Sequence, residues 1–229
     1  MCTVRLVIFD CDGVLVDSEA ISHAVLAEML SELGAPTSLD EAIEQFMGTS
    51  LPRCLELVGE RLGRTTPASF RSDFAQRTQL AFKAQLAVVP GIEEVLAQLR
   101  QPYCVASNGN RLKMNFTLAH TGLLDRFGDR MFSADDVDKP KPAPDLFLLA
   151  ARAHQAEPSR CVVIEDSPSG IREARAARMP AGESCATSQC DDATWCARAA
   201  KRNKSGAGLG LSTSPALNIR SLNRFSRPV

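Results

Sequence analysis

The sequence predicts an α/β fold in which a parallel sheet is covered by helices on both faces. Two observations support this prediction: short apolar segments recur and end in polar residues, and amphipathic helical patterns separate them. A third observation, a long helical stretch after the first apolar segment, predicts an inserted domain. The predicted architecture is therefore a Rossmann-like three-layer parallel sheet core, an inserted all-helical domain and an irregular C-terminal tail after about residue 180.

Strands are predicted where apolar residues run together. Residues 6–9 (LVIF) are apolar at every position, which is typical of a strand buried on both faces. Similar segments follow at residues 103–107, 129–136 and 161–166. Apolar residues at helical spacing predict helices over residues 91–100, 110–121 and 144–155. Because crossovers between parallel strands are right-handed, the carboxyl ends of these strands should open on one edge of the sheet.

Residues 17–87 interrupt this alternation because their patterns are helical almost throughout. Asp17 is interpreted as the N-cap of the first of these helices, and Ser38 as part of the cap of the second. The chain returns to the sheet near residues 89–91 (VPG). The predicted domains are residues 1–16 and 88–179 for the α/β core, residues 17–87 for the helical insertion, and residues 180–229 for the tail.

The regular pattern fails after Met179. Residues 180–229 show little periodicity and hold seven Lys or Arg residues against three acids, so an atypical, disordered tail without a further strand is predicted. Arg178 stands where a helix end commonly has glycine, and a left-handed conformation there would cost about 1 kcal/mol. The abrupt change suggests the hypothesis of a frame-shifted or otherwise altered C-terminus.

Composition excludes several classes of partner. The 229-residue chain has a formal net charge of -1, which gives no reason to expect binding to nucleic acid or to a membrane surface. No apolar run approaches the roughly 20 residues that span a membrane. The eight cysteines are scattered and form no C-x-x-C pair, which is typical of reduced thiols in a cytoplasmic protein. A monomer or weak dimer is expected.

Polar side chains follow the predicted strands or their connections. They are Asp10, Asp12, Ser107, Asn108, Lys141, Glu165 and Asp166. Because ligands bind at the carboxyl edge of a parallel sheet, we expect these side chains to converge. Two carboxylates 4 Å apart repel by about 4 kcal/mol at an effective dielectric near 20, so a cation must neutralise the acids. Oxygen ligands in this number suit Mg²⁺, and Lys141 adds a fixed positive charge.

These groups are suited to phosphoryl transfer. A carboxylate kept ionised by a metal can act as a nucleophile, and an acid two residues later can carry a proton. The Ser107 hydroxyl, backbone N–H groups near Asn108 and Gly109, and the Lys141 ammonium can bind phosphoryl oxygens. The implied reaction proceeds through an aspartyl-phosphate.

Four segments, in this order, resemble the motifs of haloacid-dehalogenase-type phosphohydrolases: FDCDGVLVDSE, VASNG, KPKPAPDLF and VVIEDSPSGIREA. The resemblance covers residues 4 to about 179, and the inserted helices are similar to the small helical cap of β-phosphoglucomutase-like and sugar-phosphate phosphatase members. It implies a Mg²⁺-dependent phosphatase that acts on a small-molecule phosphate ester, such as a sugar phosphate of the 6-phosphogluconate type.

The resemblance also implies roles for matching residues. Asp10 would be the nucleophile and a metal ligand, and Asp12 would be the general acid/base that ligates the metal through its backbone carbonyl. Ser107 would bind the transferring phosphoryl group. Lys141, in KPAPD, would stabilise Asp10 and the phosphate, whereas Lys139 is out of step with that motif.

At the fourth motif, the resemblance implies that Asp166 ligates the metal and that Glu165 contributes directly or through water. Asn108 and Gly109 would lie beside the phosphoryl group. Glu19 is a candidate for contact with the substrate where the cap begins, and a solvated first-turn acid is the alternative.

Two alternative functions remain open in the sequence. The first is a sugar phosphomutase, whose pattern usually has an Arg after the G-x-S of the cap and a His about ten residues after the second Asp. This sequence has Leu51 and Ser22 at those positions, with His23 one place off, so hydrolysis is favoured. The second alternative is an inactive variant whose altered C-terminus disrupts the fold.

Overall fold

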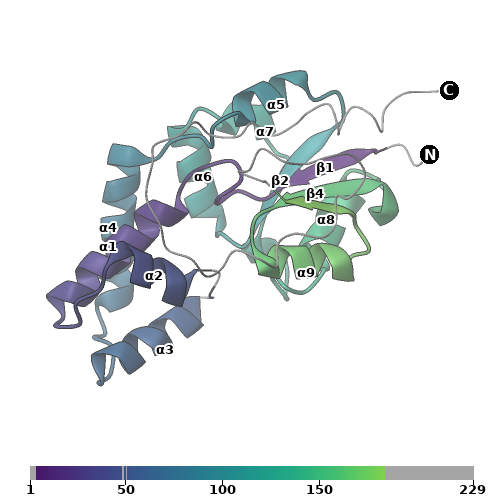
Figure 1. Ribbon diagram of the computed structural model, residues 1–229. Helices are drawn as coiled ribbons and strands as arrows, with labels where there is room; N and C mark the ends of the chain where they lie inside the picture. The colour runs from purple at the N-terminus through teal and green to yellow at the C-terminus, as the bar shows by residue number, and fades with distance from the viewer. Residues whose placement is uncertain (1–3, 48, 50, 184–229) are drawn as a thin grey trace. The chain divides into compact units, whose positions relative to one another are not determined.

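The computed structural model describes residues 4–47, 49 and 51–183, whose course Figure 1 shows. Within these residues the chain divides into two compact units. The first holds the residues up to Leu15 and from Val88 onward, and the second runs from Val16 to Ala87. The ends of the second unit meet each other, because the Asp17 N–H donates to the carbonyl oxygen of Ala87 at 3.0 Å.

The first unit is built on a five-stranded sheet in which every neighbouring pair is parallel. Its strands are β1 (Leu6–Phe9), β2 (Tyr103–Ser107), β3 (Met131–Ser133), β4 (Cys161–Glu165) and β5 (Ala181–Glu183). The order across the sheet is β3-β2-β1-β4-β5. Since β1 lies at the centre with β2 and β4 beside it, the residues that follow these three strands share one edge of the sheet.

Helices connect the strands and cover both faces. They are α5 (Ile92–Gln98), α6 (Arg111–His120), α7 (Leu124–Phe127), α8 (Asp145–Ala153) and α9 (Pro168–Ala176), with 3-10 turns η1 (Ala134–Asp136) and η2 (Pro158–Arg160). Figure 1 shows α8 and α9 on one side of the sheet and α5 and α7 on the other. This arrangement is the three-layer architecture that the alternating sequence pattern predicts.

Alternating side chains of the central strand enter two separate apolar layers. Leu6 and Ile8 are fully buried in a cluster with residues of α8 and α9, which include Leu146, Phe147 and Ala174. On the opposite face, the Phe9 ring meets Tyr103 edge-on, and Tyr103 meets Phe127 of α7 with ring centroids 5.5 Å apart. Burial on both faces explains why residues 6–9 contain no polar side chain.

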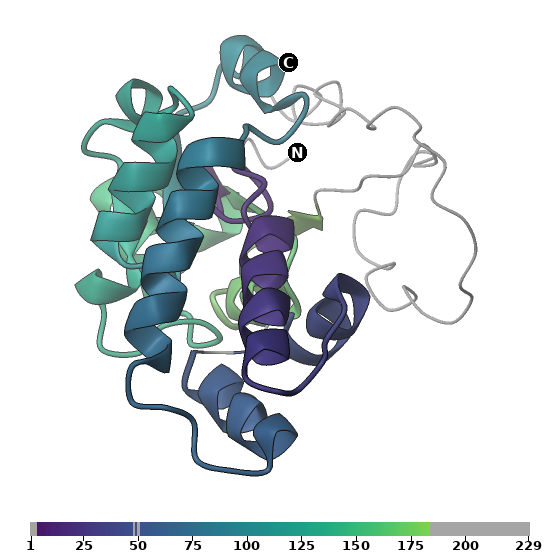
Figure 2. The same cartoon turned by 90° about the vertical axis from the view of Figure 1, so that its left-hand side faces the viewer.

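The second unit is all-helical in its described residues. Its helices are α1 (Glu19–Glu32), α2 (Leu39–Phe46), α3 (Leu51–Leu62) and α4 (Phe70–Gln85), and Figure 2 shows α1 alongside α4. Leu30, Phe46 and Phe70 share one buried cluster. Ser38 and Glu41 form a capping box at the start of α2, as predicted for Ser38. The predicted cap at Asp17 is wrong, because Ser18 is the N-cap residue of α1.

Two further predictions need correction. The strand expected over residues 129–136 covers only Met131–Ser133, because Ser133 and Asp136 then form a capping box that starts η1. The absence of a strand after Pro180 is also wrong, because β5 pairs with β4 over Ala181–Glu183.

Arg178 adopts a φ of 58°, which is the left-handed conformation that carries the cost considered above. Residues 184–229, which hold the rest of the predicted tail, lie outside the described residues. The described cysteines, which are Cys11, Cys54, Cys104 and Cys161, are free thiols. Among the described helices, none has the length and apolar content that a membrane crossing requires.

Candidate active site

Asp10 is the first residue after β1, and its backbone remains tied to the neighbouring strand. Its N–H donates to the carbonyl oxygen of Ile164 at 2.9 Å. Three residues later Gly13 adopts a φ of 75°, and a Cβ there would lie 1.9 Å from Oδ2 of Asp166. Only glycine leaves room for that carboxylate, so the turn after β1 is shaped to bring Asp166 of the β4 edge beside it.

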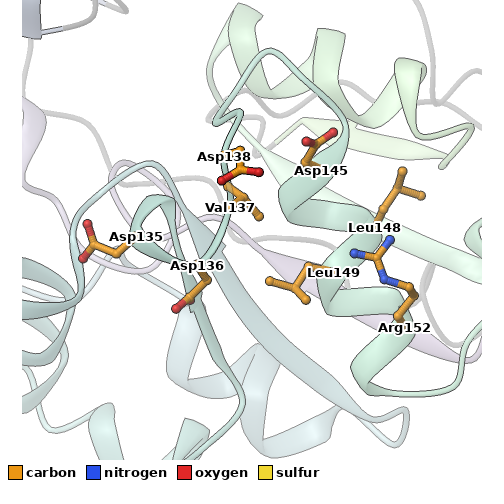
Figure 3. A pocket seen from close by; sticks show the side chains of 8 residues that line it. All are labelled: Asp135, Asp136, Val137, Asp138, Asp145, Leu148, Leu149 and Arg152. Atoms are coloured by element: carbon orange, nitrogen blue, oxygen red, sulfur yellow. The ribbon is translucent and has the colours of Figure 1, made fainter.

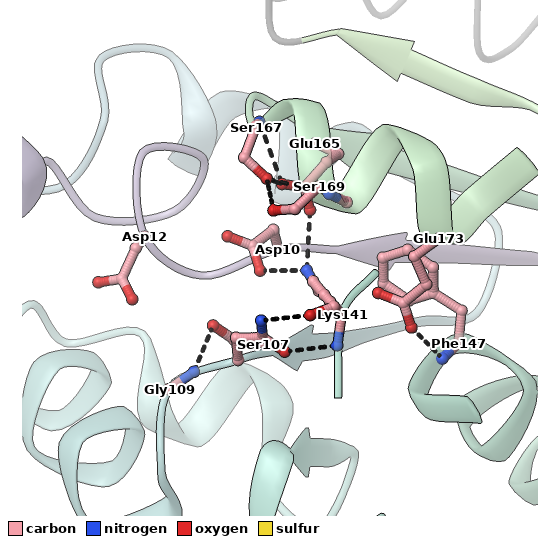
Figure 4. Close-up of polar contacts among 12 residues, drawn as sticks. Asp10, Asp12, Ser107, Gly109, Lys141, Phe147, Glu165, Ser167, Ser169 and Glu173 are labelled. Atoms are coloured by element: carbon pink, nitrogen blue, oxygen red, sulfur yellow. Dashed lines mark hydrogen bonds and ion pairs between the residues drawn. The ribbon is translucent and has the colours of Figure 1, made fainter. Parts of the chain in front are cut away.

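Lys141 joins two buried acids, as Figure 4 shows. Its Nζ lies 2.7 Å from Oδ1 of Asp10 and 2.8 Å from Oε2 of Glu165. The side chains of Lys141, Asp10 and Glu165 are 3%, 9% and 1% exposed, respectively. Charges that are this deeply buried are stabilised only when they are paired and hydrogen-bonded, and the three groups satisfy one another.

Asp10 and Glu165 together outweigh the positive charge of Lys141, and this imbalance shifts the pKa values of both the acid Asp10 and the base Lys141. Burial raises the pKa of Asp10 to about 7, the charge of Glu165 adds to this, and Lys141 opposes it. Burial lowers the pKa of Lys141, but the charges of Asp10 and Glu165 outweigh it and hold that pKa above its usual value. A further cation beside Asp10 and Glu165 would therefore be electrostatically stabilised.

Carboxylate oxygens of Asp10, Glu165 and Asp166 all lie within 4.8 Å of one another, so they could hold a metal ion. Asp10 and Glu165 are buried, whereas Asp166 is exposed. A set of hard oxygen donors beside excess negative charge fits Mg²⁺, which binds through one or two carboxylates and keeps several waters.

Glu165 is held in place by the start of α9. Its Oε1 accepts a hydrogen bond from the backbone N–H of Ser167 at 3.1 Å, while its Oε2 is paired with Lys141. A Cβ on Gly170 would lie 2.1 Å from the carboxyl carbon of Glu165, so this position also needs glycine. Both Glu165 oxygens thus have partners within the protein, and Oε2 keeps a lone pair with which Glu165 could reach a metal directly or through water.

Asp12 carries a partner that sequence reasoning missed. The Nζ of Lys113, in the first turn of α6, lies 2.8 Å from Oδ2 of Asp12, and the two side chains are 37% and 23% exposed. Burial lowers the pKa of Lys113, but the charge of Asp12 outweighs this effect and raises it. A basic residue at a helix N-terminus, where it opposes the helix dipole, was the only signal that could have drawn attention to Lys113.

The residues after β2 form a tight turn at the same edge. Ser107 is buried, and its Oγ accepts a hydrogen bond from the N–H of Gly109 at 3.2 Å. The Asn108 side chain faces the backbone of Lys141 instead, since its Oδ1 accepts from the Lys141 N–H at 2.9 Å and its Nδ2 donates to the Lys141 carbonyl at 3.4 Å. Asn108 therefore positions Lys141 in this structure.

Sequence reasoning also missed two residues behind Lys141, Phe147 of α8 and Glu173 of α9. The Lys141 Nζ lies 4.7 Å from the centroid of the Phe147 ring, within the range of a cation–π contact. The Phe147 N–H donates to Oε1 of Glu173 at 3.0 Å. Glu173 is fully buried, and its Oε2 has no hydrogen-bond partner among the described residues. Neither residue stands at a strand end, so the rule that located the acids could not find them.

Two other features lie apart from this cluster. Glu19 is the first residue of α1 and belongs to the second unit, so its predicted contact with substrate stays a prediction. A pocket of about 510 Å³ lies between the residues after β3 and α8, and Figure 3 shows its lining. It is lined by Asp135, Asp136, Val137, Asp138, Asp145, Leu148, Leu149 and Arg152. None of the residues predicted for the site lines this pocket.

Comparison with known proteins agrees with this geometry. Residues 4–178 match the family model of the haloacid dehalogenase-like hydrolases. The chain is 31% identical to 6-phosphogluconate phosphatase of Escherichia coli over 188 residues, covering 81% of this chain and 85% of that protein. It is 30% identical to fructose-1-phosphate phosphatase YqaB of Escherichia coli over 176 residues, covering 76% and 93%.

A solved structure is also similar. The crystal structure of a HAD family hydrolase from Deinococcus radiodurans, with bound phosphate and sodium, superposes with a TM-score of 0.69 at 30% identity, covering 80% of this chain and 81% of that one. The family match spans most of the chain and includes every strand end described above, apart from that of β5. The chain therefore belongs to the haloacid dehalogenase-like hydrolases and, within them, to the group that hydrolyses phosphate monoesters.

Proposed function

We propose that this protein is a Mg²⁺-dependent phosphatase that hydrolyses a small sugar phosphate through an aspartyl-phosphate on Asp10. The observation that carries the proposal is the Asp10 carboxylate at the carboxyl edge of the sheet, which lies 2.7 Å from the Nζ of Lys141 and within 4.8 Å of carboxylate oxygens of Glu165 and Asp166. The relatives support the substrate class, because 6-phosphogluconate and fructose 1-phosphate are both sugar phosphates.

In the first step, a carboxylate oxygen of Asp10 attacks phosphorus, and the bond from phosphorus to the substrate oxygen breaks. Asp12, which must be protonated at this stage, gives its proton to the departing alkoxide, so the sugar leaves as an alcohol. In the second step, Asp12 takes a proton from a water molecule, whose oxygen attacks the same phosphorus. The acyl-phosphate bond breaks, inorganic phosphate is released, and the Asp10 carboxylate is regenerated.

Cations and donors around Asp10 hold the phosphoryl oxygens during both steps. The Lys141 ammonium and the Ser107 hydroxyl are positioned to bind them, and Asn108 fixes the backbone of Lys141. The metal would be held by Asp10, Asp166, the backbone carbonyl of Asp12 and, directly or through water, Glu165. When bound, it supplies positive charge that keeps Asp10 ionised and stabilises charge on the phosphoryl group.

The helical unit would act as the cap in this proposal. A cap excludes bulk water and contacts the organic part of the substrate, and Glu19 stays a candidate for that contact. Ser22 and His23, which stand near the position of a mutase histidine, hydrogen-bond within their own helix: Ser22 Oγ donates to the Ser18 carbonyl, and His23 Nδ1 contacts the Glu19 carbonyl. This arrangement supports hydrolysis over phosphomutase action.

Turnover by an Asp10→Asn variant tests the nucleophile. We expect purified wild-type protein to release phosphate from sugar phosphates with Mg²⁺ and to lose this activity with a chelator, whereas Asp10→Asn should be inactive but folded. Asp17→Asn, which removes an exposed acid outside the site, should keep wild-type turnover. Borohydride reduction during turnover should convert Asp10 to homoserine, which mass spectrometry detects.

The products separate the alternatives. Incubation with 6-phosphogluconate, fructose 1-phosphate and hexose 1-phosphates should yield free phosphate. An isomeric sugar phosphate would instead identify a phosphomutase, and no turnover of any phosphate monoester would favour the inactive variant. Activity that survives Asp10→Asn would refute the assignment of the nucleophile.

A further inference from the structure

Lys113 is a charged group at the site that the steps proposed above do not use. It reaches Asp12 from α6, with Nζ 2.8 Å from Oδ2 of the carboxylate. The exposed fractions of the two side chains, 37% and 23%, show that this ion pair is partly exposed. The Lys141 cluster, in contrast, is closed from solvent.

The helix that carries Lys113 does not explain why a lysine stands there. Asn110 caps α6, its side chain accepts from the N–H of Lys113, and no acid lies in the first helical turn. The N-terminus of a helix carries partial positive charge and favours acids over bases. Lys113 is therefore placed against the local preference of its helix, and its contact with Asp12 opposes this cost.

The Asp12 carboxylate faces the turn that is proposed to hold the phosphoryl group. A Cβ on Gly109 would lie 3.6 Å from Oγ of Ser107 and 3.7 Å from Oδ2 of Asp12, so both oxygens border the same small space. A phosphate monoester at neutral pH carries up to two negative charges. In its ionised form, which the second step above requires while the phosphoryl group is on Asp10, an uncompensated Asp12 would repel this anion at the place where Ser107 binds it.

We propose that Lys113 is a positioning residue that neutralises Asp12 and fixes its carboxylate, so that a dianionic phosphoryl group can bind beside it. The inference rests on the proposed function, because it assumes that phosphate enters next to Ser107. It assigns Lys113 an effect through the charge of Asp12, and not a direct contact with phosphate.

A double-mutant cycle on the affinity for inorganic phosphate tests this. Calorimetric titration with phosphate in the presence of Mg²⁺ compares wild type, Lys113→Met, Asp12→Asn and the double variant. We expect Lys113→Met to weaken phosphate binding about tenfold or more in the wild-type background. In the Asp12→Asn background, where no negative charge needs neutralising, the same change should weaken it by less than about twofold.

Matched variants separate charge from shape. Lys113→Arg keeps the positive charge and should bind phosphate within about threefold of wild type. Arg111→Met removes a positive charge from the same turn of α6, but Arg111 pairs with Asp136, so phosphate affinity should not change. Lys113→Gln repeats the measurement with a polar side chain in case the apolar one perturbs folding.

Two results would overturn the inference. Equal weakening in both backgrounds would mean that Lys113 binds phosphate itself, and unchanged affinity would mean that the pair is only a surface contact. The proposed function is tested separately, by turnover of the wild-type chain. If the wild-type enzyme is active and Lys113→Met leaves the phosphate affinity unchanged, this inference is refuted and the phosphatase assignment stands.

Discussion

Two lysines pair with the acids that follow β1, in opposite environments. Lys141 is closed from solvent between Asp10 and Glu165, whereas Lys113 and Asp12 are both partly exposed. Removing one member of a buried pair leaves an uncompensated charge, whereas an exposed pair contributes little to stability. The comparison teaches that the same chemical pair can occur buried and partly exposed at one edge of the sheet, and the two pairs are expected to differ in what they contribute to stability.

Lys141→Met should have the largest effect, because it leaves two buried carboxylates without their cation. At pH 8 we expect the free energy of unfolding to fall by about 3–5 kcal/mol. Turnover should fall by about 10²–10³-fold, as expected when one donor to the reacting group is lost. Denaturant titration and phosphate release measure the two effects.

Lys139→Met is the matched control for Lys141→Met, since Lys139 lies two residues earlier in the same segment and is exposed. It should change the free energy of unfolding by no more than about 0.5 kcal/mol. If both variants lose equal stability, the contrast between buried and exposed lysines is wrong.

Glu173 extends the comparison to a buried acid with no ion-pair partner among the described residues. Burial raises its pKa from 4.5 to about 8, against the opposing charge of Lys141. In that pH range the folded chain keeps a proton that the unfolded chain releases, so stability should fall as the pH rises from about 4.5 to 8. The slope should approach about 1.4 kcal/mol per pH unit within this window.

Glu173→Gln removes this titration and keeps an oxygen that can accept from the Phe147 N–H. Urea unfolding at pH 5, 6, 7 and 8 should show that the free energy of unfolding of the variant increases relative to that of wild type as the pH rises. Glu94→Gln, at an exposed position of α5, should show no such trend. A constant difference between Glu173→Gln and wild type over this range would mean that Glu173 is already ionised.

The sequence predicted most of the sheet but failed at its edge, for a physical reason. Residues 6–9 are buried on both faces, so their apolar run identifies them as a strand. Residues 181–183 (AGE) have neither an apolar run nor enough length to show a period, and they form β5 because their backbone pairs with β4. Arg178 takes the left-handed conformation that usually falls to glycine at a helix end, so the energetic cost considered from the sequence applies in the structure.

The same division holds at the site. The convergence of Asp10, Glu165 and Asp166 followed from strand ends that share one edge. Lys113 and Glu173 lie within helices, where a charged residue is ordinarily solvated, and nothing local identifies a partner from another element. Tertiary contacts decide the role of such residues, so the sequence predicted the convergence of the acids and missed the helical groups around them.

The smallest effect on stability is expected for Lys113→Met. This measurement tests directly whether the partly exposed Lys113–Asp12 pair differs from the buried Lys141 pair. An exposed ion pair contributes about 0–1 kcal/mol, and removing a base from a helix N-terminus returns roughly 0.3–1 kcal/mol. The two contributions oppose each other, so the free energy of unfolding should stay within about 0.5 kcal/mol of wild type. Denaturant titration without phosphate measures it, and a loss above about 2 kcal/mol would show that the Lys113–Asp12 pair behaves like the buried one. If stability is unchanged and phosphate binding is weakened, Lys113 contributes to anion binding through its charge and not to the stability of the fold.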